Sequence, residues 1–184
     1  MVFSDYLGEL RRIYARFDVS LALAPGCSDA ALSEAERRLG LRLDRGLHEA
    51  WSSADGSLDE CNVFMRPGFL TGYEFLSLEA ALEERESRRR IAPNYEGYVE
   101  DTLRDTRIQA GWFQEGWLPF AGFGSGTLLL MLDHSPAETG KPGQIIAFTH
   151  DPDEITYVAP DFASFIEGSL AAIKEEPEDF LQLY

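Results

Sequence analysis

The sequence predicts an α+β fold in which an N-terminal layer of helices packs on a mostly antiparallel sheet of about five to six strands, closed by a C-terminal helix. Three observations predict it. Apolar residues recur at helical spacing in three segments before residue 55. Strand-like runs separated by short turns then dominate as far as residue 159. Strands and helices do not alternate along the chain, as they would in a doubly wound fold.

The N-terminal layer consists of three predicted helices, over residues 4–17, 28–39 and 45–54. The first begins after Ser4 or Asp5 as its cap, and the second has Ser28 as N-cap and Gly40 at its end. The apolar stripes that define the three helices are Leu7, Leu10, Ile13, Tyr14 and Phe17; Ala31, Leu32, Ala35 and Leu39; and Leu47, Ala50, Trp51 and Ala54.

The next segment contains short strands and a helix. The runs NVFM, FL and YEFL are rich in aromatic and branched residues, and Pro67-Gly68 and Thr71-Gly72 separate them as turns. A helix begins at Ser77 and ends near the run RESRRR, residues 85–90. We interpret this run as a solvated face in the last helical turn, where cations complement the helix dipole, rather than as a nucleic-acid patch.

The C-terminal half supplies most of the sheet. The runs WLPFAGF, TLLLMLD and GQIIAFTHD predict three strands, and ITYVA predicts a shorter fourth one. The middle run, TLLLMLD, is apolar on both faces and is therefore expected at the centre of the sheet. A final helix is expected to begin near Pro160 and Asp161. Residues 91–116 are the least informative segment, with one or two helical turns expected between Glu96 and Ile108.

Composition and charge limit the functions that the chain can have. The 184 residues carry a formal net charge of −16, and residues 108–184 alone hold 12 acidic and 2 basic side chains, a net charge of −10. Such a chain lacks the basic face that phosphate neutralisation needs, which argues against nucleic-acid binding and favours a basic partner. The sequence contains neither a signal-peptide core nor a membrane-length apolar run, so a soluble, cytoplasmic protein of one domain (residues 1–184) is expected. Cys27 and Cys61 are expected to be reduced and apolar in character.

The stretch GFGSG, residues 122–126, raises the question of a phosphate loop or a nucleophile. A dinucleotide loop precedes a helix, but these glycines precede the strand-like run TLLLML. A P-loop needs a lysine that this stretch lacks, and a nucleophile elbow needs glycine where Phe123 stands. The stretch therefore predicts a turn between two strands, and no catalytic residue, cofactor or hydrolytic triad is predicted.

Metal binding is a weaker alternative. The pairs Asp133-His134 and His150-Asp151 both end predicted strands. If those strands were neighbours, the two imidazoles and two carboxylates could converge as ligands. Residues of these types at strand ends more often serve turns, so no metal site is predicted.

The order of motifs in the C-terminal half resembles the SUKH superfamily, the Smi/Knr-type domain. The pattern runs from a Trp-x-Pro strand through a glycine turn and an apolar strand ending in Asp to a Gly-Gln strand, a His-Asp strand end and a Phe-rich helix. The resemblance covers about residues 28–174, with one departure at Asp44, which replaces a usual proline and is able to act as an N-cap. The residues that carry the match as structural positions are Trp117, Pro119, Gly126, Gly140, Gly143, Gln144, Phe162 and Phe165.

The resemblance implies a domain without enzymatic activity that acts by binding proteins. In bacteria the family is associated with immunity proteins that neutralise toxins, often nucleases, and in fungi with regulation of cell-wall synthesis. A cytoplasmic immunity protein for a basic toxin domain is the first hypothesis, and an intracellular regulatory or scaffold protein is the alternative. The residues proposed to contact a partner are acids at loop and strand ends and possible aromatic anchors, namely Asp133, Asp151, Asp153, Glu154, Tyr95, Tyr98 and Trp112.

Overall fold

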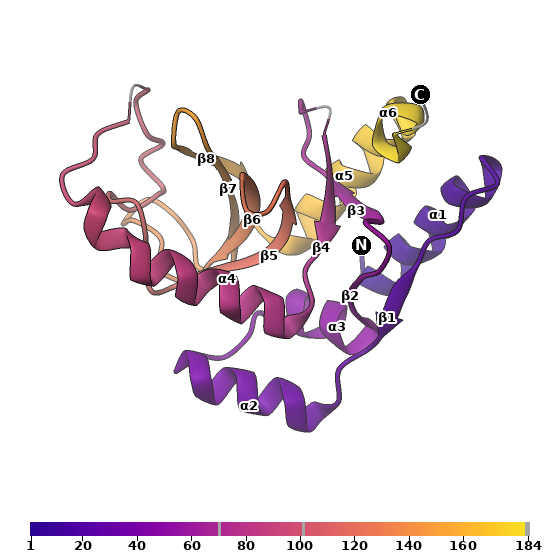
Figure 1. The fold of residues 1–184 in the computed structure, drawn as a ribbon, viewed down its shortest axis with the longest axis horizontal. Helices are drawn as coiled ribbons and strands as arrows, with labels where there is room; N and C mark the ends of the chain where they lie inside the picture. Colours follow the sequence, from indigo (N-terminus) through magenta and orange to yellow (C-terminus); the bar gives the residue numbers. More distant parts are fainter. Residues whose placement is uncertain (70, 101, 183–184) are drawn as a thin grey trace.

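The computed structural model describes residues 1–69, 71–100 and 102–182 (Figure 1). Its largest element is a six-stranded antiparallel sheet in which neighbouring strands follow chain order. The strands are β3 (Asn62–Met65), β4 (Gly72–Phe75), β5 (Trp117–Phe123), β6 (Leu128–Asp133), β7 (Gln144–Thr149) and β8 (Glu154–Ala159). The predicted α+β class is confirmed. A second, two-stranded sheet pairs β1 (Leu23–Pro25) with β2 (Ala54–Ser57) and was not predicted, because both segments are short and contain Pro or Gly.

Helices surround the sheet (Figure 1). They are α1 (Phe3–Arg16), α2 (Asp29–Leu39), α3 (Arg45–Ser53), α4 (Leu78–Ile91), the 3-10 turn η1 (Ala92–Tyr95), α5 (Phe162–Glu175) and α6 (Pro177–Leu181). Over the described part of the chain, none of the helices combines the length and apolar character needed to cross a lipid bilayer.

The predicted helix caps hold in most cases. The side chains of Ser28, Asp44 and Ser77 each accept a hydrogen bond from a backbone N–H in the first turn of the helix that follows. Gly40 ends α2 with a left-handed φ of 68°. Asp161 is the N-cap of α5, where its carboxylate accepts from the Ser164 N–H at 2.7 Å.

Helix α1 begins two or three residues earlier than the capping pattern predicts. Val2 is its N-cap position and makes no side-chain capping bond, so Ser4 and Asp5 lie inside the first turn. Phe3 is buried in the core, and burial of this ring compensates for the missing polar cap.

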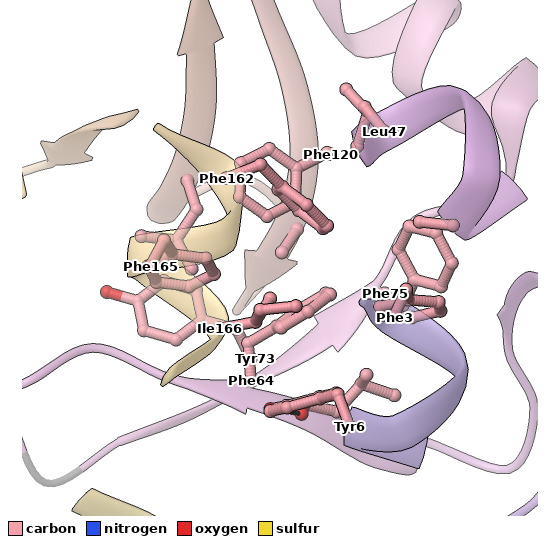
Figure 2. Close-up of a cluster of buried hydrophobic side chains, with 14 of the residues drawn as sticks. Phe3, Tyr6, Leu47, Phe64, Tyr73, Phe75, Phe120, Phe162, Phe165 and Ile166 are labelled. Atoms are coloured by element: carbon pink, nitrogen blue, oxygen red, sulfur yellow. Dashed lines mark hydrogen bonds between the residues drawn. The ribbon is translucent and has the colours of Figure 1, made fainter. Parts of the chain in front are cut away.

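Aromatic side chains fill the main core between the sheet and α1, α3 and α5 (Figure 2). Phe64 of β3 lies at its centre, with six rings at centroid distances of 5.5 to 6.3 Å. These rings belong to Phe3, Tyr6, Phe75, Phe120, Phe162 and Phe165. The apolar stripe of α5 is buried in this core, with Phe162, Phe165, Ile166, Leu170 and Ile173 among its buried residues.

Strand β6 is buried on both faces, as the sequence predicts for a central strand. Leu130 and Leu132 point into the main core, whereas Leu129 and Met131 point into a second apolar cluster on the opposite face. That second face is covered by the end of α4 and by residues of the segments 92–95 and 108–113.

Three local predictions are wrong. Gly72 begins β4 instead of forming a turn, and a Cβ at this position would lie 2.4 Å from the Asn62 side chain. The described part of segment 96–108 contains no helix, and the helical turn lies earlier, at η1. Phe69 of the predicted FL strand lies in a loop, and Leu70 falls outside the described residues.

Candidate functional site

The glycine-rich stretch forms the hairpin turn between β5 and β6. Gly124, Ser125 and Gly126 have φ values of 61°, 54° and 86°, and Phe123 pairs directly with Leu128 across the turn. Consecutive positive φ values are what a tight hairpin turn requires. The prediction of a turn between strands is therefore confirmed.

The two histidine–aspartate pairs do not meet. Strands β6 and β7 are antiparallel, with Asp133 opposite Gln144 and Leu128 opposite Thr149. His134 and His150 therefore lie at opposite ends of a strand pair about 17 Å long. Across residues 1–69, 71–100 and 102–182, no three His, Cys, Asp or Glu side chains are arranged to hold a metal ion.

Four of the proposed partner-binding residues converge on the second face of the sheet, namely Tyr95, Tyr98, Trp112 and Asp153. Tyr95 stacks on Trp112 with ring centroids 4.2 Å apart and an interplanar angle of 12°. Tyr98 meets Tyr95 edge-on, and the edge of Phe148 from β7 meets Trp112. We call Arg88, Tyr95, Tyr98, Trp112 and Phe148 the aromatic layer.

Asp153 ties the aromatic layer to the β7–β8 loop. Its carboxylate accepts hydrogen bonds from Trp112 Nε1 and His150 Nδ1, both at 2.5 Å, and its backbone carbonyl accepts from the Tyr98 hydroxyl at 2.6 Å. The Asp153 side chain is buried. Its role in this structure is thus to hold the layer in place, and it is not exposed as a surface contact would be.

Arg88 is the residue of this layer that the sequence analysis missed. It is 4% exposed, and its guanidinium carbon lies 4.0 Å from the Trp112 ring centroid and 3.7 Å from that of Phe148. Burial lowers the pKa of Arg88 to about 10, against the raising effect of Glu84 and Asp153. The prediction that the whole arginine run faces solvent is wrong at this position. A signal was present, because Arg88 follows Ala81 by two helical turns and shares its buried face.

A clamp formed by Arg104 organises the loop that follows Tyr98. Its guanidinium donates to both carboxylate oxygens of Glu100 and to the carbonyls of Gln109 and Gly111, at 2.6 to 2.8 Å. Glu100 also accepts from the Ile155 N–H of β8 at 2.8 Å. Both side chains of this ion pair are largely buried, so the loop is anchored to the sheet by charge-assisted bonds.

The anchored loop exposes apolar side chains. Leu103 is 99% exposed, Val99 is 81% exposed and Tyr98 is 37% exposed. We call these three residues the apolar tip. Exposed large aliphatic groups next to an anchored ion pair are typical of a protein-interaction site.

The proposed acidic contacts are placed differently from one another. Asp151 is exposed, and Glu154 is half-buried and accepts from the Thr102 hydroxyl close to the apolar tip. Asp133 is 0% exposed and accepts from the Ser135 N–H and the Gln144 side chain. Asp133 is therefore an internal residue, because the register of β6 and β7 places the Gln144 donor beside it.

The family-motif residues lie in structural positions. Gln144 is buried, and its amide donates to Asp133 and to the Arg107 carbonyl, both at 2.9 Å. A Cβ on Gly140 would lie 2.4 Å from that same carbonyl. The remaining motif residues are buried in the cores, pair within the sheet or adopt positive φ, namely Trp117, Pro119, Gly126, Gly143, Phe162 and Phe165.

Comparison with known proteins agrees with this arrangement. The model of the SMI1 / KNR4 family (SUKH-1) matches residues 26–168. The chain belongs to this family. It is also 26% identical over 162 residues to the cell wall biosynthesis/cell cycle regulator smi1 of Schizosaccharomyces pombe. That alignment covers 82% of this SMI1/KNR4-family chain but 31% of the fungal protein, so the chain spans about a third of that relative.

Proposed function

We propose that this SMI1/KNR4-family protein is a non-catalytic binding domain that neutralises a basic toxin, as a cytoplasmic immunity protein. The observation that carries the proposal is the apolar tip, which presents Val99 and Leu103 to solvent from a loop fixed by the Arg104 clamp. A few residues carry most of the affinity of an interface, Tyr98 is of a type common among them, and anchoring by Arg104 lowers the entropic cost of binding.

Charge supports a basic partner. Glu154, the first residue of β8, lies beside the tip through its hydrogen bond with Thr102, Asp151 is exposed in the β7–β8 loop, and residues 108–184 carry a net charge of −10. An acidic surface accelerates association with a basic protein, and this acceleration becomes smaller as the salt concentration increases. A nuclease toxin presents basic surface to its own substrate and fits this requirement.

A regulatory role is the second candidate. It is favoured by the similarity to the fungal regulator smi1, whose name records cell-wall and cell-cycle functions. In that case the same tip would bind a protein of the host cell. The two roles differ in gene context, since an immunity gene lies next to a toxin-like reading frame and a regulator does not require one.

The experiment is co-expression with the product of the adjacent gene, followed by co-purification and a growth-rescue assay. We expect the wild-type chain to rescue growth and the Val99→Asp, Leu103→Asp double variant to lose at least tenfold in affinity. The control is Leu58→Asp, since Leu58 is a 48% exposed apolar residue that follows β2, away from the tip. Absence of any complex, or equal loss in the control, would count against the proposal.

A further inference from the structure

A second surface lies beside the aromatic layer, next to the glycine turn between β5 and β6. An open groove of about 610 Å³ runs between α4 and the β5–β6 turn. Its floor is apolar, formed by Leu76, Ala80 and Leu129, and its rim includes Phe123, a ring that is 38% exposed. Nothing in the Asp153 network or the Arg104 clamp uses this groove.

The walls of the groove carry carboxylates. Glu74 comes from β4, and Glu83 and Glu84 come from α4, with Arg90 as the one basic side chain along the lining. Glu84 lies directly against the turn, because a Cβ on Gly126 would be 3.2 Å from its carboxylate oxygen. Burial raises the pKa of both Glu74 and Glu84; the nearby charge of Glu60 raises that of Glu74 further, whereas the charge of Arg88 lowers that of Glu84.

The groove acids differ from the other acids of α4 in their partners. Glu79 forms an ion pair with Arg38, and Glu86 forms one with Arg89, both on the outer surface. Within the described ranges, Glu74 and Glu84 make no ion pair and no hydrogen bond. Half-buried carboxylates without donors are destabilising unless a ligand supplies the donors.

We infer that this groove binds an arginine or lysine side chain of a protein partner. The aliphatic stem matches the apolar floor, the cation matches the carboxylates, and the Phe123 ring offers a cation–π contact at the entrance. An anionic ligand is disfavoured by three carboxylates against one arginine. The inference rests on the proposed function only in taking the ligand to be a protein.

The test uses a peptide probe and NMR spectroscopy of the full chain labelled with nitrogen-15. The acetylated and amidated peptide Gly-Leu-Arg-Leu-Gly is titrated in, and the matched peptide carries citrulline in place of arginine. We expect amide shifts confined to Gly122–Gly126 and Glu83–Ser87, and at least tenfold weaker binding of the citrulline peptide, which keeps the shape and loses the charge.

Two double variants that remove the same number of charges, one pair in the groove and one pair outside it, test whether the peptide binds in the groove. Glu74→Gln combined with Glu84→Gln is expected to weaken the arginine peptide at least fivefold. Glu79→Gln combined with Glu86→Gln, which removes the same charge from the outer surface, is expected to stay within twofold of wild type. Equal binding of the citrulline peptide, equal loss in both double variants, or no shift at millimolar peptide would overturn the inference. None of these outcomes bears on the apolar tip, which the peptide does not probe.

Discussion

The face of the sheet that packs on α1, α3 and α5 is filled by side chains from regular helices and strands, whereas the opposite face is covered by the end of α4, by η1 and by loop residues such as Ile108 and Trp112. The first face contains interlocking rings around Phe64. The second contains a buried charge, Arg88, and a buried carboxylate, Asp153, each against aromatic rings. Apolar packing supplies the stability of the first face, and polar contacts fix the positions of the side chains on the second face. The apolar tip projects from the second face.

The largest predicted effect concerns the main core. Phe64→Ala is expected to lower the free energy of unfolding by about 3 to 5 kcal/mol, because the substitution leaves a cavity among six rings. Urea denaturation followed by circular dichroism measures it. Phe123→Ala, at the exposed glycine turn, serves as control and is expected to change stability by about 0.5 kcal/mol or less. A small loss at Phe64 would mean that the main core is not the stable part of the fold.

Arg88 distinguishes packing from charge on the second face. Arg88→Ala is expected to cost about 2 to 4 kcal/mol, because it removes the contacts with the Trp112 and Phe148 rings and opens a cavity. Arg88→Met is expected to cost about 1 kcal/mol or less, since it fills the space and avoids burying a charge. Urea denaturation of both variants, followed by circular dichroism, measures the two losses of stability. If both variants are equally destabilised, the charge itself holds the layer, through Glu84 and Asp153.

The hydrogen bonds to Asp153 test the polar half of the comparison. Trp112→Phe removes the donor to the carboxylate and is expected to cost about 1.5 to 3 kcal/mol, the range for a bond to a charged group. Tyr98→Phe removes a donor to the Asp153 backbone carbonyl and is expected to cost about 1 kcal/mol. A larger loss from Tyr98→Phe than from Trp112→Phe would contradict the ranking.

The same contrast explains what the sequence could and could not predict. Main-core residues such as Phe165 and Leu130 follow helical periodicity or lie in a continuous apolar run, and both patterns are visible locally. Tyr95, Tyr98 and Trp112 were singled out by residue type, but their convergence on Asp153 depends on the pairing of β7 with β8 and on a loop without periodicity. Asp133 illustrates the opposite error, because a strand-end acid looks exposed until the register places Gln144 beside it.

A pH effect is expected at the groove beside the second face. Because burial raises the pKa of Glu84 above 4.5, the folded chain binds more protons than the unfolded chain just above that pH. Stability should therefore fall as pH rises through this window. Glu84→Gln should make the fall shallower and raise stability at pH 7 by roughly a few tenths of a kcal/mol, since solvent screens a half-exposed group. Urea titrations between pH 4 and 8 compare the two proteins, with Glu86→Gln as the surface control. A steeper loss of stability with rising pH in Glu84→Gln than in the wild type would contradict the expected direction of this effect.

The smallest stability effect belongs to the apolar tip, and it separates binding from folding. Leu103→Ser changes a side chain that is 99% exposed, so the free energy of unfolding should stay within about 0.5 kcal/mol of wild type. Arg104→Met, in contrast, removes four hydrogen bonds from the clamp and leaves Glu100 buried without its cation, so it should destabilise the loop. If the tip is the binding element and the clamp its support, both variants lose partner binding, but Arg104→Met alone shows faster amide hydrogen exchange in residues 96–111. If Leu103→Ser retained partner binding, Leu103 would not be part of the binding element and the loop would have a structural role only, because this substitution removes no buried contact.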